Sequence, residues 1–177
     1  LDHDNVENPQ IFVEMAKKAA SAENSFYLEW GPELLAFDLE LNLSASLGVQ
    51  NDNDKAMRGL FRDLNFRKAL NYAIDREGIG QALVRGPFMR AFPGGLYPGC
   101  PYFDRKSVVY YPYNVDSAKA LLAEMGFKDT DNNGILNWAD GVLKGQDLII
   151  QMTAHEDQAA AVLIAETLVS MLREVGI

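Results

Sequence analysis

The chain has 177 residues, 48% of them hydrophobic and 23% charged, which is the composition of a globular protein. There are 25 acidic and 16 basic residues, so the formal net charge is -9. The basic residues are scattered along the chain, and binding to a nucleic acid is therefore electrostatically opposed. The single cysteine, Cys100, excludes an internal disulfide and any multi-cysteine metal site. We expect one domain over residues 1–177.

The N-terminal part predicts a helix and then a strand. Asn8 and Pro9 are suited to the cap and first turn of a helix whose apolar face extends to residue 19. Over residues 35–43, leucines and Phe37 alternate with smaller or polar residues, which predicts a strand buried on one face. Residues 51–55 are polar and are expected to form a loop.

Residues 63–86 predict two consecutive helices. The apolar residues of the first recur at the spacing of one helix face: Phe66, Ala69, Leu70, Ala73 and Ile74. Asp75 stands where its side chain can cap a second helix, and Glu77 places negative charge near the positive end of that helix dipole. A break near Asp75 is therefore expected.

The C-terminal half predicts alternating helices and extended segments. An extended segment over residues 108–111 precedes a helix that Asn114 caps and Gly126 ends. A strand over residues 147–153 then leads into a long amphipathic helix ending near Gly176. This order favours an α/β fold, with a mixed β-sheet flanked by helices.

The loop over residues 86–103 is rich in proline and glycine and is the predicted place of ligand contact. Its aromatic and cationic side chains, together with a tryptophan earlier in the chain, are of the kind that lines small-molecule clefts. The alternative is that these aromatic residues only cover the core beneath the loop. The predicted ligand-binding residues are Trp30, Phe88, Arg90, Phe92 and Tyr97.

The sequence DTDNNGILNWAD, residues 129–140, has the pattern of a calcium-binding loop. Gly134 allows the sharp turn that such loops need, but Asp140 occupies the twelfth position, where a bidentate glutamate is usual. The alternative is a turn in which Asp and Asn side chains bond to their own backbone. No cofactor is required by the pattern, and a calcium ion would take these ligands: Asp129, Asp131, Asn133, Ile135, Asn137 and Asp140.

Catalytic motifs are lacking in the sequence. His3 lies near the chain start and His155 has no second histidine one helical turn away. No nucleophile elbow, phosphate-binding glycine loop or dinucleotide fingerprint is present. We therefore expect that the chain is not an enzyme.

Several stretches resemble one protein family in the same order along the chain. LFRDLNFRKALNYAIDREGI, residues 60–79, is the most specific, and YPYNVDSAKALLAEMGF, residues 111–127, is the next. ELNLS at 40–44, DTDNNGILNW at 129–138 and the ending REVGI at 173–177 also fit. Over residues 26–177 the chain resembles the extracytoplasmic solute-binding proteins of ABC importers, in particular the peptide- and nickel-binding class known as family 5.

The resemblance implies one lobe of a type II periplasmic-binding-protein-like fold, part of a longer two-lobed protein. Such a protein closes around a peptide or similar small solute and delivers it to the membrane permease of an ABC transporter. A periplasmic or cell-surface location, a signal peptide outside this chain and a monomeric state are expected. The alternative is an independent calcium-binding interaction module built on residues 129–140.

Overall fold

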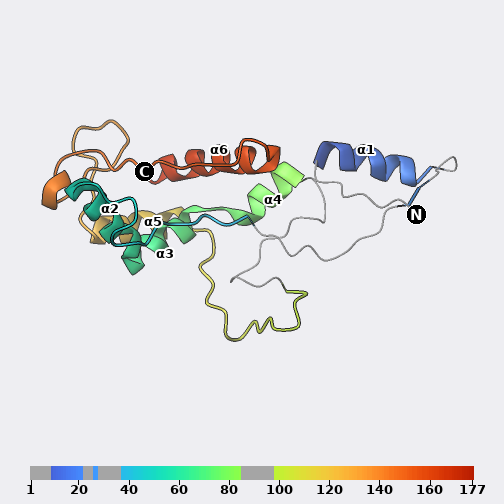
Figure 1. Cartoon of the computed structure of the whole chain (residues 1–177), viewed down its shortest axis with the longest axis horizontal. Coiled ribbons are helices and arrows are strands. Elements are labelled where there is room, and N and C mark those ends of the chain that lie inside the picture. Colours follow the sequence, from blue (N-terminus) through green and yellow to red (C-terminus); the bar gives the residue numbers. More distant parts are fainter. Residues whose placement is uncertain (1–8, 22–25, 28–36, 85–97) are drawn as a thin grey trace. The chain divides into compact units, whose positions relative to one another are not determined.

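The computed structural model describes residues 9–21, 26–27, 37–84 and 98–177. In these parts it is mainly helical (Figure 1). The elements are α1 (Pro9–Ala19), α2 (Asp52–Arg62), α3 (Leu64–Ala73), α4 (Arg76–Val84), α5 (Val115–Glu124), the short 3-10 helix η1 (Gly141–Leu143) and α6 (Ala159–Glu174). None of the helices in the described residues is both long and apolar enough to span a membrane.

The chain forms two compact units. The first comprises Leu1–Phe37, Arg76–Val109 and Ala154–Ile164, and the second comprises Asp38–Asp75, Tyr110–Thr153 and Ala165–Ile177. In the first unit α1 contacts α4, and Ile79 of α4 is buried. That all 177 residues belong to one domain stays a prediction.

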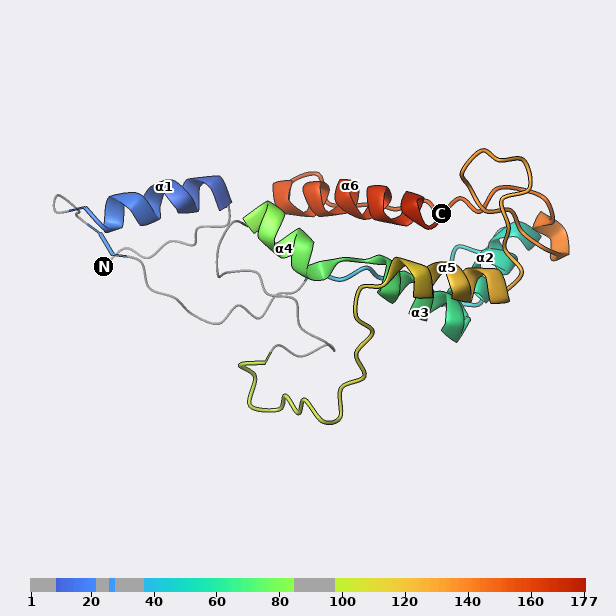
Figure 2. The ribbon, with the colours of Figure 1, turned by 180° about the vertical axis from the view of Figure 1, so that it is seen from behind.

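The main hydrophobic core lies in the second unit, around α3 and α5. These two helices make extensive contact, and the view from behind shows them side by side (Figure 2). Phe66, Leu122 and Leu148 are the largest fully buried side chains. The core is completed by Leu60, Phe61, Ala69, Leu70, Ala73, Ala118, Phe127, Leu172 and Val175. Burial of these side chains is the principal stabilising term for the unit.

The predicted helices are confirmed in the described residues. The five apolar residues assigned to one face of α3 and its end are all buried, and α4 begins at Arg76, directly after the expected break. Asn114 caps α5, because its Oδ1 accepts the N–H of Ser117 at 2.8 Å. Gly126 ends that helix with a φ of 93°, a left-handed conformation that favours glycine.

The polar residues 51–55, expected to form a loop, instead begin α2 at Asp52. Asn51 and Asp54 form a capping box, in which each side chain accepts a backbone N–H of the other residue. Polarity alone favours a loop, whereas this reciprocal pairing makes the same residues the first turn of a helix.

The predicted mixed β-sheet is wrong for the described residues. They contain no sheet, only two isolated antiparallel bridges, Lys128 with Asn137 and Asn137 with Asp147. A strand needs the backbone of a neighbouring strand to pair its N–H and C=O groups. Alternating side chains in residues 37–43 favour an extended backbone, but they do not specify a neighbouring strand with which it could pair. Phe37 and Leu43, which were expected on the buried face, are exposed.

Candidate functional site

The sequence predicts ligand contacts in two segments that the structure does not describe. Trp30, Phe88, Arg90, Phe92 and Tyr97 all lie outside the described residues. Their role in ligand contact stays a prediction. The candidate site described below lies in residues 126–147, all within the second compact unit.

Asp129 organises the first turn of the calcium-like loop. Its Oδ1 accepts the backbone N–H of Asn133 at 3.2 Å, and its Oδ2 accepts the N–H of Gly134 at 2.9 Å. The hydrogen bond from Gly134, with further ones from Asn132 and Asn133, lowers the pKa of the Asp129 carboxyl below its ordinary value of 3.8. Gly134 has a φ of 87°, which is the sharp turn predicted from the sequence.

Asn137 occupies the centre of the loop and is only 3% exposed. Its Oδ1 accepts the backbone N–H of Thr130 at 2.7 Å and the Thr130 hydroxyl at 2.6 Å. Its Nδ2 donates to Asp147 Oδ1 at 2.7 Å, while Asn133 Nδ2 donates to Asp147 Oδ2 at 3.1 Å. One carboxylate thus joins two amides of the loop.

The backbone fixes Asn137 between two neighbouring segments. Its N–H donates to the C=O of Lys128 at 2.8 Å. On either side, the N–H of Leu148 donates to the C=O of Leu136 at 2.7 Å, and the N–H of Leu136 donates to the C=O of Gly176 at 2.8 Å. The loop is therefore bonded both to the segment after α5 and to the end of α6.

The predicted calcium ligands are largely engaged in hydrogen bonds within this loop. Asp129, Asp131, Asn133 and Asn137 all form such bonds, and the backbone N–H of Ile135 donates to Asn133 Oδ1 at 2.7 Å. Asp140 caps η1 without a side-chain hydrogen bond. In the part of the chain that the structure describes, no group of three or more His, Cys, Asp or Glu could hold a metal ion. The geometry is that of an Asx-rich turn, and calcium at this loop stays a prediction.

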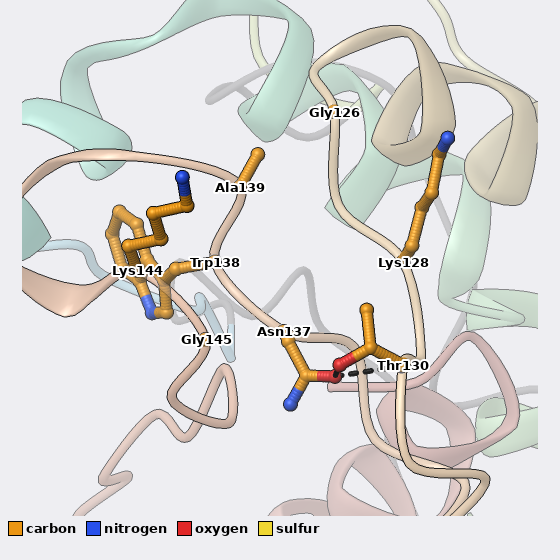
Figure 3. A pocket seen from close by; sticks show the side chains of 8 residues that line it. All are labelled: Gly126, Lys128, Thr130, Asn137, Trp138, Ala139, Lys144 and Gly145. Atoms are coloured by element: carbon orange, nitrogen blue, oxygen red, sulfur yellow. Dashed lines mark hydrogen bonds between the residues drawn. The ribbon is translucent and has the colours of Figure 1, made fainter.

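Beside the loop is a hollow of about 360 Å³ (Figure 3). Trp138 forms part of its wall, and its ring meets the ring of Phe127 edge-on, with centroids 5.5 Å apart. The backbone N–H of Trp138 donates to the C=O of Gln146 at 3.0 Å, and the N–H of Gly145 donates to the C=O of Trp138 at 2.9 Å. The lining residues are Gly126, Lys128, Thr130, Asn137, Trp138, Ala139, Lys144 and Gly145.

The hollow is not predicted by the sequence. Of its lining residues, only Asn137 was predicted as a site residue, and it was predicted as a metal ligand. Nothing in the sequence distinguishes Lys128 and Lys144 from other surface lysines. Both lysines line the same hollow because two β-bridges, between residues 128 and 137 and between residues 137 and 147, bring their segments together. The available signal is the pair of glycines, Gly126 and Gly145, both of which have positive φ.

The lining contains an indole ring, an amide, a hydroxyl and two ammonium groups, but no serine, cysteine or histidine. This set is suited to holding a ligand and lacks a nucleophile with its base. The chain belongs to the bacterial extracellular solute-binding proteins, family 5, and matches the middle region of that family over residues 4–177.

Two curated proteins illustrate the relationship. The chain is 39% identical over 177 residues to the periplasmic alpha-galactoside-binding protein of Rhizobium meliloti (strain 1021), covering 99% of this chain and 26% of that protein. It is 30% identical over 118 residues to the oligopeptide-binding protein AppA of Bacillus subtilis (strain 168), covering 67% of this chain and 21% of that protein. The chain thus spans about a quarter of the length of the curated relatives it matches.

Two solved structures are also similar. The periplasmic binding protein MelB from Agrobacterium fabrum C58, in complex with stachyose, matches with a TM-score of 0.90 and 39% identity, over 99% of this chain and 26% of that one. The oligopeptide-binding protein from Thermus thermophilus, complexed with a pentapeptide, matches with a TM-score of 0.57 and 27% identity, over 71% of this chain and 20% of that one.

These findings confirm the family predicted from residues 26–177. They also confirm, at the level of the family, the extracytoplasmic location and the expectation that the chain is not an enzyme. The alternative of an independent calcium-binding module gains no support from them.

Proposed function

We propose that the chain is part of a longer protein that captures a small solute outside the cytoplasm and delivers it to the membrane permease of an ABC importer. Membership of the solute-binding family over residues 4–177 supports this function. The protein acts as a monomer and needs no cofactor. The solute is held where two lobes close on it, because closure requires contacts from both sides.

The proposed solute class is an α-galactoside oligosaccharide, and not the peptide expected from the sequence. The observation that carries this choice is the 39% identity over 99% of the chain shared with an alpha-galactoside-binding protein and with a structure that holds stachyose. The similarity to the oligopeptide-binding proteins is lower and covers less of the chain. A neutral oligosaccharide presents hydroxyl groups and flat C–H faces, which aromatic side chains can contact.

Calorimetric titration of the protein, produced at the length of its relatives, tests this function. Stachyose should give saturable heat, and a pentapeptide should give none. Replacement of the predicted contact Phe92 by alanine should weaken stachyose binding about tenfold, since one aromatic contact is worth about 1 to 1.5 kcal/mol. The matched control Tyr27→Ala, which truncates an exposed aromatic residue, should leave the affinity unchanged.

Other results of the titration would contradict parts of the proposal. Binding of the pentapeptide without stachyose would overturn the oligosaccharide class but keep the capture function. Binding of neither, by a folded protein, would contradict the proposed solutes together. An equal loss in Phe92→Ala and Tyr27→Ala would remove Phe92 from the site.

A further inference from the structure

We propose that the hollow lined by residues 126–145 is a second ligand site, which binds a small organic carboxylate carrying a ring. The residues of this site are different from the predicted contacts in the loop over residues 86–103, and its proposal does not depend on which solute the longer protein captures. Its lining includes the indole of Trp138 with Lys144 beside it, and Lys128 on the opposite side (Figure 3).

The uncharged polar side chains of the lining, Asn137 and Thr130, are already paired with each other. Asn137 accepts two hydrogen bonds from Thr130 through Oδ1 and donates to Asp147 through Nδ2. The hydroxyl proton of Thr130 is used in one of these bonds. The charged side-chain donors in the lining are the ammonium groups of Lys128 and Lys144, and the indole N–H of Trp138 is a further, neutral donor.

Both of these lysines are exposed, and in the described residues neither forms an ion pair; the ion pairs found there are Glu14 with Lys17 and Asp52 with Lys55. An ammonium group offers three donors and no acceptor. A ligand that complements it must present acceptors, and a carboxylate does so with the stronger, charge-assisted type of hydrogen bond. A neutral sugar, whose hydroxyls also need acceptors, is less well matched.

The remaining lining favours a ring on the ligand. Trp138 is half-buried and is held by its contact with Phe127, so its position is fixed before a ligand arrives. Gly126 lies close against Ala139, since a Cβ on it would be 3.0 Å from the Cβ of Ala139, so this edge of the hollow carries no larger side chain. Together with the apolar stems of the two lysines, these groups form a surface on which one face of a ring can pack. A hollow of about 360 Å³ has room for a ligand with one ring.

The test uses Trp138 as its own reporter. The chain has two tryptophans, so Trp30→Phe leaves Trp138 as the single indole in the 177-residue chain. D-galacturonate should change its fluorescence in a saturable manner. D-galactose, which lacks the carboxylate, and inorganic phosphate, which lacks the ring, should produce no saturable change over the same concentrations.

Variants in the same background assign the site. Lys128→Ala and Lys144→Ala should each weaken galacturonate binding about tenfold, which corresponds to the loss of one charge-assisted hydrogen bond. Lys119→Ala, which removes an exposed lysine of α5, should leave the affinity unchanged. Thermal unfolding of each variant shows whether it is folded, since both target lysines are exposed and their loss should not affect stability.

A response to galactose equal to that to galacturonate would overturn the requirement for an anion, and an equal response to phosphate would overturn the requirement for a ring. Absence of any response in the folded chain would overturn the site itself. Equal weakening in all three lysine variants would show an effect of net charge and would likewise overturn it.

Discussion

At the scale of single residues, Asn137 holds the candidate site together. It is buried, it lies in both β-bridges, and it bonds to Thr130 and Asp147. In the sequence it occupies the ninth position of a calcium loop, which predicts a metal ligand. The structure instead uses both ends of its amide for hydrogen bonds within the protein.

Replacement of Asn137 by alanine should lower the free energy of unfolding by about 2 to 3 kcal/mol, because it leaves the N–H and hydroxyl of Thr130 and the Oδ1 of Asp147 without their partner. Urea denaturation of the chain measures this loss. Asn65→Ala, which truncates an exposed amide on α3, should change stability by less than about 0.5 kcal/mol. A loss in Asn137→Ala no larger than that of the control would contradict the central role of Asn137.

The lowered pKa of Asp129 gives the loop a dependence on pH. A carboxyl with a folded-state pKa below its unfolded value of about 3.8 stabilises the fold above that value, and the contribution is lost as the pH falls through the folded pKa. Asp129→Asn should therefore reduce stability at pH 7, and the difference from the unmodified chain should shrink below about pH 3.8.

Denaturation curves at several pH values measure this difference. Asp140→Asn is the matched control, since it lies in the same loop and its side chain makes no capping hydrogen bond. If both variants show the same pH profile, the hydrogen bonds from Gly134 and Asn133 do not stabilise the ionised form of Asp129.

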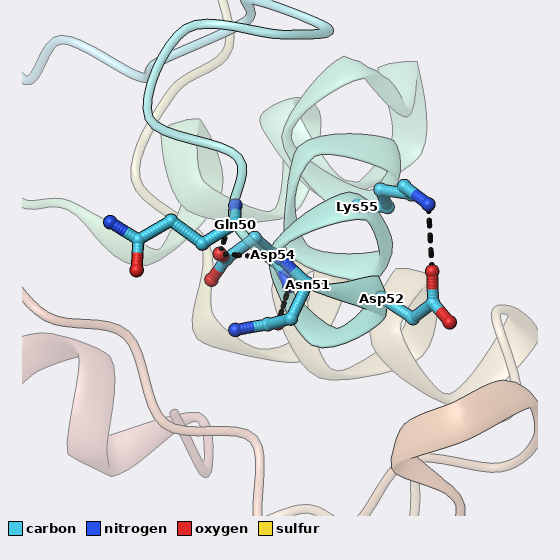
Figure 4. A network of polar contacts seen from close by, with 5 residues as sticks. All are labelled: Gln50, Asn51, Asp52, Asp54 and Lys55. Carbon is cyan, nitrogen blue, oxygen red and sulfur yellow. Dashed lines mark hydrogen bonds and ion pairs between the residues drawn. The ribbon is translucent and has the colours of Figure 1, made fainter.

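At the scale of elements, local hydrogen bonds decide where the helices begin. Asn51 Oδ1 accepts the N–H of Asp54 at 2.9 Å, while Asp54 Oδ2 accepts the N–H groups of Asn51 and Gln50 at 3.3 Å and 2.8 Å (Figure 4). The exposed pair of Asp52 with Lys55, 2.7 Å apart, lies on the same turn. Asp63 both follows α2 and caps α3, by accepting the N–H groups of Asn65 and Phe66. The spacing of residue types is the sequence signal for such bonds, although residues 51–55 were expected to form a loop.

Gly176, just after α6, lies in close contact with Leu136 of the loop over residues 129–140. Gly176 has a φ of 87°, and a Cβ on it would lie 2.7 Å from Leu136 Cγ. Gly176→Ala should therefore cost about 2 to 4 kcal/mol, from backbone strain and overlap together. Gly141→Ala isolates the strain, since Gly141 has a φ of 70° with open space around its Cβ position, and it should cost about 1 kcal/mol.

Urea denaturation of the two glycine variants measures both costs. Equal losses would mean that Leu136 moves away at no cost, and that the contact between α6 and the loop is loose.

At the scale of the whole molecule, the chain forms two compact units and belongs to a family of solute-binding proteins whose matched members are longer. The family follows from the ordered series of sequence motifs, whereas the solute class depends on relatives that cover the chain to different extents.

We expect the chain to have the same melting temperature in calcium and in chelator, because the carboxylates and amides of residues 129–137 are already hydrogen-bonded. A ligand that binds only the folded state raises stability by mass action. Thermal unfolding in the two buffers measures the effect. A higher melting temperature in calcium, abolished by Asp129→Asn, would show that the ion predicted from the sequence is bound.

Local features of this protein could be predicted from its sequence, and the non-local ones could not. The helix faces at Phe66 to Ala73, the cap at Asn114 and the positive φ at Gly126 and Gly134 depend on residues within a few positions of one another. The expected strands failed because a strand is defined by a partner that alternation of side chains does not specify.

The sequence by itself determined the family, the helices other than α2 and the turn at residues 129–134, since each rests on the identity and spacing of neighbouring residues. Only the tertiary structure decided that Asn137 pairs with Thr130 and Asp147 and that Lys128 and Lys144 line one hollow beside Trp138. The physical reason is that backbone bridges and core packing bring distant residues together, and their energies depend on the whole fold.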